Sequence, residues 1–317
     1  MRLYIDKENV NALLDSNKED PELFSESVRL IKKGLQVYYN FPKSEMLTNP
    51  SLEVWFRMVN GAGVNYSNLF CPTETIKPDR PVKTNFYTSY DSNDRCSLYL
   101  LDIPENTYNI IRDKNSILIG RPEDEMEVFK KLLAIPERPT SVMKRIISWK
   151  NYLPVIPFTD VILFDNYYFK DADLYKKNEN ELIRALASIP KDTFNLVIIV
   201  KEKQIDEKLN LEEEYINIKK IIADESHLSS KKCAVTIMTT FKTHSRHIVT
   251  NYYTISPTAE VHLKDPTFKS DSDISAESHT NRLAIENMRN LIDLANDISH
   301  TSQRIIGDKR SNFISFT

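Results

Sequence analysis

The C-terminal half of the chain alternates continuous apolar runs with stretches whose apolar positions recur at helical spacing. The apolar runs at 161–164 and 196–200 are typical of strands buried on both faces, and 234–239, which includes two threonines, is predicted as a third strand. The stretches at 181–188 and 211–223 are typical of helices packed on a sheet. This alternation predicts βαβ units and a largely parallel sheet with flanking helices, which a fourth strand over 248–255 extends.

The N-terminal half has shorter and less regular segments of the same two kinds. Its strands are predicted at 3–5, 35–39, 97–101 and 116–119. Its helices are predicted at 21–33, 52–59, 123–134 and 142–149, with a long irregular region at 60–95. Pro154 and Pro157 then indicate a linker. We therefore predict an α/β protein of two domains: a mixed α/β domain at 1–150 and the largely parallel domain at 158–317.

The end of the chain is predicted to be a polar, exposed loop at 264–278 followed by one long helix at 281–304. The apolar residues of this helix recur in steps of four and three, as in a coiled coil. They are Ala284, Met288, Leu291, Ala295 and Ile298. This narrow seam fits either a helix docked on its own domain or the interface of a homodimer or protein complex.

Composition excludes several functions. The 5 glycines lack the spacing of a phosphate-binding loop or a dinucleotide-binding turn. The 3 cysteines have neither zinc-ligand nor disulfide spacing, so we expect reduced thiols and no metal or cofactor. The first residues are charged, and no apolar stretch approaches a membrane span, so we expect a cytoplasmic protein without membrane partners. The net charge of −3 leaves room for a local basic groove.

One short segment carries candidate chemistry. Counting from His244, Arg246 follows at +2 and Asn251 at +7, between two predicted strands. A histidine near its usual pKa can act as a nucleophile or proton carrier. The planar arginine fork can bind two phosphate oxygens at once, and His247 is close enough in sequence to assist. The segment therefore suggests a phosphate-binding site with His244, Arg246 and Asn251 as catalytic candidates.

This H-x-R-x-x-x-x-N pattern resembles the H-x-K-x-x-x-x-D signature of the phospholipase D-like superfamily, with Arg and Asn as the departures. Asp165-Asn166-Tyr167 is similar to the D-x-Y that opens related modules, so Asp165 and Tyr167 are expected to support the site. The resemblance covers residues 158–265. It implies a metal-independent phosphodiesterase that needs two copies of the motif, hence a homodimer. The implied ligand is a phosphodiester. Nucleic acid is favoured over lipid because no membrane-directed amphipathic or polybasic segment accompanies the motif. The resemblance and a composition rich in Asn, Lys, Ile, Tyr and Phe together suggest bacterial defence or nucleic-acid processing.

Three other interpretations stay open at this point. The degenerate motif also fits a non-catalytic interaction or assembly module, because an amide at Asn251 lacks the charge that polarises a histidine. His244 and Arg246 can also simply form a satisfied polar pair at the start of a strand. Finally, Asp6 and Glu8 follow the first strand and could begin a Mg²⁺-dependent nuclease site of the PIN type, although no partner acid stands out.

Overall fold

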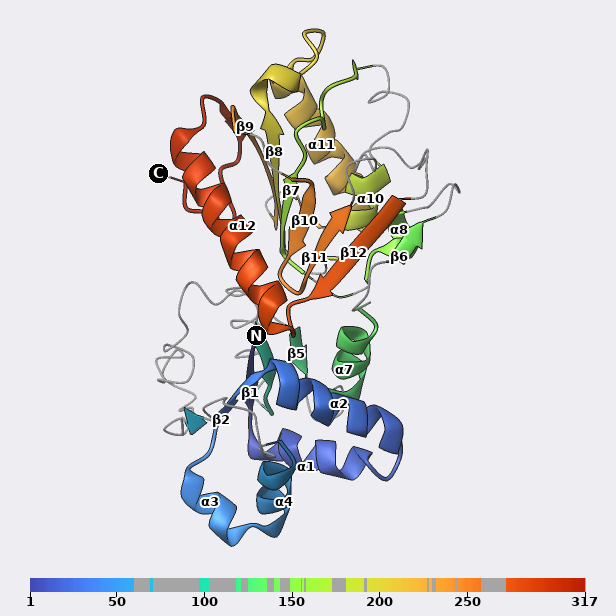
Figure 1. Ribbon diagram of the computed structural model, residues 1–317, viewed down its shortest axis with the longest axis vertical. Coiled ribbons are helices and arrows are strands. Elements are labelled where there is room, and N and C mark those ends of the chain that lie inside the picture. Colours follow the sequence, from blue (N-terminus) through green and yellow to red (C-terminus); the bar gives the residue numbers. More distant parts are fainter. Residues whose placement is uncertain are drawn as a thin grey trace. The chain divides into compact units, whose positions relative to one another are not determined.

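A computed structural model gives the architecture of the chain (Figure 1). It describes residues 1–59, 69–70, 97–102, 118–120, 125–135, 140–142, 149–154, 156, 158–172, 181–190, 193–226, 228–229, 232–242, 245–257 and 272–316. The contacts divide the chain into two compact units: an N-terminal unit of 1–134 with 279–282, and a C-terminal unit of 135–278 with 283–317. Among the described helices, none combines the length and apolar character needed to span a membrane.

The N-terminal unit contains a sheet of five parallel strands in the order β3-β2-β1-β4-β5. These strands are β1 (Arg2–Ile5), β2 (Gln36–Tyr39), β3 (Leu69–Phe70), β4 (Ser97–Leu100) and β5 (Leu118–Gly120). The helices of this unit are α1 (Lys7–Ser16), α2 (Pro21–Gly34), α3 (Lys43–Thr48), α4 (Pro50–Val59) and α7 (Glu125–Leu133). The chain builds the sheet outward from β1, first toward β3 and then toward β5.

Local sequence explains why the first two helices begin where they do. The Asp6 carboxylate accepts a hydrogen bond from the backbone N–H of Asn9, and Asp20 does the same for Leu23. Each aspartate thus caps a helix by satisfying an N–H that has no partner within the helix. Pro21 fits the first position of α2, where its missing N–H costs nothing. The sequence analysis predicted α2 but missed α1 and α3.

The C-terminal unit has an eight-stranded sheet in the order β13-β9-β8-β7-β10-β11-β12-β6. Its strands are β6 (Thr140–Val142), β7 (Asp160–Phe164), β8 (Phe194–Lys201), β9 (Cys233–Thr240), β10 (His247–Thr250), β11 (Tyr253–Pro257), β12 (Ser272–Ser278) and β13 (Ile305–Gly307). Only β7, β8 and β9 are parallel, and the other described strands pair antiparallel. The α/β class is confirmed, but the prediction of a largely parallel sheet is wrong for this unit.

Two predictions are wrong for the segments that form the antiparallel half of the sheet. The predicted single strand at 248–255 is a hairpin, since the Thr250 hydroxyl accepts hydrogen bonds from the N–H groups of Tyr252 and Tyr253 and closes a tight turn. The predicted loop at 264–278 contains β12, which pairs with β11 and β6. The predicted helix at 142–149 lies mostly outside the described residues; Val142 ends β6 and Trp149 begins α8 (Trp149–Tyr152).

Helices cover this sheet on both sides. Figure 1 shows α10 (Glu181–Ala187) and α11 (Leu211–Ser226) on the side opposite α12 (Arg282–Thr301). In the predicted seam of α12, Ala284, Met288, Ala295 and Ile298 are buried within the chain's own fold. The structure therefore shows α12 docked on its own chain, and the seam does not support a homodimer.

Candidate functional site at the carboxyl end of β7

The chain reverses its direction across the C-terminal sheet at β7. It adds β8 and β9 on one side of β7 and then returns to place β10 on the other side. In open α/β sheets, ligands bind outside the carboxyl ends of the strands at such a switch point. Asp165 directly follows β7, and Arg246 directly precedes β10, so the two residues meet at this place.

Asp165 and Arg246 form a buried ion pair there. The Nε of Arg246 donates a hydrogen bond of 3.2 Å to Oδ1 of Asp165, and the side chains are only 8% and 1% exposed. The same Oδ1 accepts a 2.9 Å hydrogen bond from the N–H of Tyr167, which shapes the turn after β7. The Arg246 guanidinium also lies 5.2 Å from the centre of the Tyr167 ring. Arg246 is thus held by Asp165 of its own chain. The predicted polar pair of His244 with Arg246 stays a prediction, because His244 is not among the described residues.

His247 belongs to a different environment from Arg246. Its Nδ1 lies 2.9 Å from the Ser256 hydroxyl on β11, and its ring meets the edge of Phe164. Neighbouring residues of an extended chain point to opposite faces of the sheet. The contacts of His247 with Ser256 and Phe164 are therefore distinct from those of Arg246 with Asp165 and Tyr167. The sequence analysis predicted that Arg246 and His247 bind one phosphate, but the structure does not bring these two side chains together.

Asn251 lies at the other end of β10. Its Oδ1 accepts hydrogen bonds of 3.0 and 3.1 Å from the N–H groups of Thr159 and Asp160, and the residue is fully buried. The register pairs His247 with Phe164 and Thr250 with Val161, so the extended strand separates Asn251 from Arg246 by roughly 17 Å. The prediction that Asn251 shares the site is wrong, because a spacing of seven residues spans the whole strand. His244 lies outside the described residues.

Two exposed aromatic rings lie at the same edge of the sheet: Tyr167, which was predicted as a supporting residue, and Phe241, which was not predicted. Tyr167 is 39% exposed after β7, and Phe241 is 50% exposed directly after β9. Since β8 lies between β7 and β9, these strand ends are about 10 Å apart. The Lys170 ammonium lies 5.2 Å from the Tyr167 ring, and Lys242 follows Phe241. The signal available in the sequence was an aromatic residue and a lysine closely following a buried strand.

A second ion pair lies farther along this edge. Arg304 meets Glu202 at 3.1 Å, and its carbonyl accepts a hydrogen bond from the N–H of Thr239 on β9. Lys242 pairs with Asp297 of α12. In the described part of the chain, no three His, Cys, Asp or Glu side chains gather as metal ligands. The edge therefore combines cations, carboxylates and aromatic faces.

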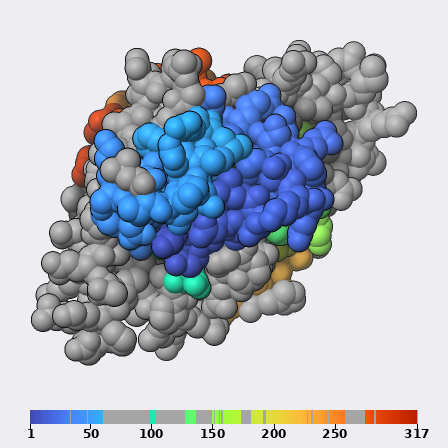
Figure 2. Space-filling view, turned by 90° about the horizontal axis from the view of Figure 1, so that it is seen from below, coloured from blue at the N-terminus to red at the C-terminus, as the bar shows by residue number. Residues whose placement is uncertain are grey.

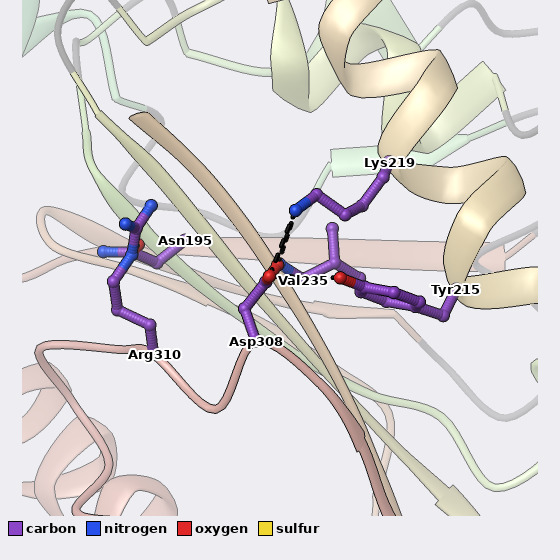
Figure 3. Close-up of polar contacts among 6 residues, drawn as sticks. All are labelled: Asn195, Tyr215, Lys219, Val235, Asp308 and Arg310. Atoms are coloured by element: carbon purple, nitrogen blue, oxygen red, sulfur yellow. Dashed lines mark hydrogen bonds and ion pairs between the residues drawn. The ribbon is translucent and has the colours of Figure 1, made fainter. Parts of the chain in front are cut away.

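The opposite edge of the sheet has polar contacts of another kind. Asp308, which follows β13, accepts hydrogen bonds from Tyr215, Lys219 and the N–H of Val235 (Figure 3). Buried Asp160 similarly accepts from Ser311 and from the side chain and N–H of Asn312.

In Figure 3, Arg310 also lies beside Asn195, to which its Nε donates a hydrogen bond of 3.0 Å. Each of these contacts joins the C-terminal segment to the sheet or to α11. These contacts hold residues 308–312 against the sheet and α11. The candidate site is therefore the other edge, at the carboxyl ends of β7–β9.

Comparison with known proteins adds no identity: no family model matches the chain, and no curated protein is significantly similar to it. The resemblance to the phospholipase D-like superfamily remains a prediction.

Proposed function

We propose that the C-terminal unit binds single-stranded nucleic acid at the carboxyl edge of β7–β9 and does so without cleaving it. The observation that carries this proposal is the ring of Tyr167, which is exposed at the switch point with two cations, Arg246 and Lys170, against it. Single-strand binding sites combine aromatic faces, on which bases stack, with positive charge for the phosphates. Phe241 and Lys242 supply a second aromatic face and a second ammonium at the same edge.

Binding is favoured over catalysis by where the motif residues lie. Arg246 is committed to Asp165, and Asn251 supports the opposite end of β10. A metal-independent phosphodiesterase rests on the family resemblance alone. A role in bacterial defence or nucleic-acid processing rests on that resemblance and on composition, and a homodimer on the resemblance and on the apolar seam of the long helix. The proposal keeps the phosphodiester ligand of the first interpretation from the sequence and the non-catalytic character of its alternative, the interaction or assembly module.

The proposal is tested by fluorescence anisotropy with a labelled single strand of about 16 nucleotides. Stacking contributes about 1–3 kcal/mol per base, so Tyr167→Ala should weaken binding about 5- to 150-fold. Tyr167→Phe keeps the ring and should bind like the native chain. Ile216→Ala is the matched control, because Ile216 is 62% exposed on α11 of the same unit.

Unchanged affinity of Tyr167→Ala, or no binding by the native chain at low salt, would refute the proposal. The same mixtures, kept in EDTA and run on a denaturing gel, should show an intact strand. Cleavage that His244→Ala abolishes would instead establish the metal-independent phosphodiesterase.

A further inference from the structure

The ion pair between Arg304 and Glu202 lies at the carboxyl edge of β7–β9, and the proposed function leaves it without a role. Glu202 directly follows β8, and Arg304 directly precedes β13. β8 lies between β7 and β9, and the exposed rings of Tyr167 and Phe241 follow the ends of those two strands. The pair therefore lies along the same edge as the rings on which bases are proposed to stack.

The backbone of Arg304 is held at the end of β9. Its carbonyl accepts a hydrogen bond of 3.1 Å from the N–H of Thr239, two residues before Phe241. The hydroxyl of Ser302 donates a hydrogen bond of 2.8 Å to the carbonyl of Thr239. The position of Arg304 along the edge is thus fixed by its main chain and does not depend on its side chain.

The loop that begins at Glu202 is tied to the loop that contains Tyr167. The N–H of Asp206 donates a hydrogen bond of 2.9 Å to the carbonyl of Phe169. The Asp206 carboxylate accepts one of 3.1 Å from the N–H of Ala172. The charges of the ion pair and the ring after β7 therefore belong to one connected part of the edge.

The ion pair is of a kind that a phosphate group can displace. The Nη2 of Arg304 lies 3.1 Å from Oε1 of Glu202, and the two side chains are 43% and 24% exposed. Pairs as exposed as this contribute little, because water and salt screen the charges. A phosphate offers the guanidinium two oxygens at once, as a carboxylate does. Arg246, by contrast, is only 8% exposed and is committed to Asp165.

Glu202 opposes the displacement. Its Oε2 is buried and has no hydrogen-bond partner among the described residues. When Arg304 turns to a phosphate, the Glu202 carboxylate also loses the partner of its other oxygen, which is unfavourable for a partly buried charge. We propose that Arg304 binds a phosphate of the single strand and that Glu202 competes with this phosphate for the guanidinium. The inference rests on the proposed function, which places the strand at this edge.

The first test is fluorescence anisotropy with the labelled strand of about 16 nucleotides over a series of salt concentrations. Arg304→Gln keeps the carbonyl that accepts from Thr239, and it should weaken binding about 5- to 10-fold at low salt. One phosphate contact with a single strand contributes about 0.7 to the slope of log affinity against log salt, so the slope should fall by about 0.7. Arg304→Lys keeps the charge and should keep the slope.

The matched control for Arg304→Gln is Arg57→Gln. Arg57 pairs with Glu53 on α4 of the N-terminal unit, with side chains 77% and 52% exposed. In Figure 2 the first 59 residues of that unit appear in blue. The substitution removes the same charge outside the carboxyl edge of β7–β9, so the affinity and the salt slope should match those of the native chain.

The second test concerns the competition. Glu202→Gln frees the guanidinium and should tighten binding about 2- to 5-fold. Glu207→Gln is the matched control, because Glu207 is exposed in the same loop and forms no ion pair with the described residues. It removes a negative charge without releasing a cation, and it should bind like the native chain.

The inference is overturned if Arg304→Gln leaves both the affinity and the salt slope unchanged, or if Glu202→Gln binds no more tightly than Glu207→Gln. Either result in a chain whose binding Tyr167→Ala weakens removes the role of Arg304 and Glu202 but keeps the proposed function. A native chain that binds no strand at low salt overturns both.

Discussion

The buried ion pair between Asp165 and Arg246 allows a quantitative test of how the switch point of the C-terminal unit is held together. Asp165→Asn removes the negative charge but keeps an oxygen that can accept from the N–H of Tyr167. Because the Arg246 side chain is only 8% exposed, its charge would remain buried after losing the Asp165 carboxylate. Breaking such a pair on one side typically costs about 3–5 kcal/mol, and we expect the lower end of this range.

The assay can be confined to the C-terminal unit. The chain has 2 tryptophans, Trp55 in the N-terminal unit and Trp149 in the C-terminal unit, so a Trp55→Phe background leaves Trp149 as the only reporter of urea unfolding. The control is Asp297→Asn, which breaks the Lys242 pair at the same edge. Its side chains are 52% and 54% exposed, so about 1 kcal/mol or less is expected.

Replacing both partners, with Asp165→Asn and Arg246→Met together, should restore part of the lost stability, since no unpaired charge remains. The reasoning is refuted if Asp165→Asn costs no more than Asp297→Asn.

Two further predictions concern the C-terminal segment. Burial alone would raise the pKa of Asp308, but hydrogen bonds from Val235, Lys219 and Tyr215 lower it. The carboxylate therefore stabilises the fold above the ordinary aspartate pKa, and this contribution is lost as the pH falls through the lower pKa of the folded state. Asp308→Asn should therefore unfold at lower urea than the native chain at pH 7, and this gap should close below about pH 4; a pH-independent gap contradicts the assignment. Gly307→Ala should destabilise the same unit by about 1–3 kcal/mol in urea, because φ is +105° and a Cβ would lie 2.3 Å from the carbonyl oxygen of Val235. Equal stability would show that β13 shifts to accept the methyl group.

The strands that the sequence predicted well are those buried on both faces. β7 and β8 contain apolar runs of four and five residues, and β9 alternates apolar residues with threonines; such runs are typical of strands at the centre of a sheet. β12 was missed because Ser272–Ser278 is mostly polar and is recognisable as a strand only from its partners. The hairpin of β10 and β11 was missed because its turn lacks Gly and Pro and depends on the Thr250 hydroxyl.

The candidate site was predicted in part for a similar reason. Asp165, Tyr167 and Arg246 do meet, although 81 residues separate Asp165 from Arg246, because each lies at the end of a strand in one sheet. The spacing in sequence between Arg246 and Asn251 could not place Asn251, because the distance between the two residues depends on whether the residues between them are extended. Phe241 was overlooked because exposure cannot be read from residue type.

The most direct test of single-strand binding at the carboxyl edge of β7–β9 is photochemical cross-linking of the native chain to a uracil-containing strand, followed by mass spectrometry of the peptides. The account predicts adducts in the segments 158–172 and 232–242, which contain Tyr167 and Phe241, and their loss when both residues are replaced by alanine. Adducts confined to the N-terminal unit, or undiminished in the double variant, would contradict it.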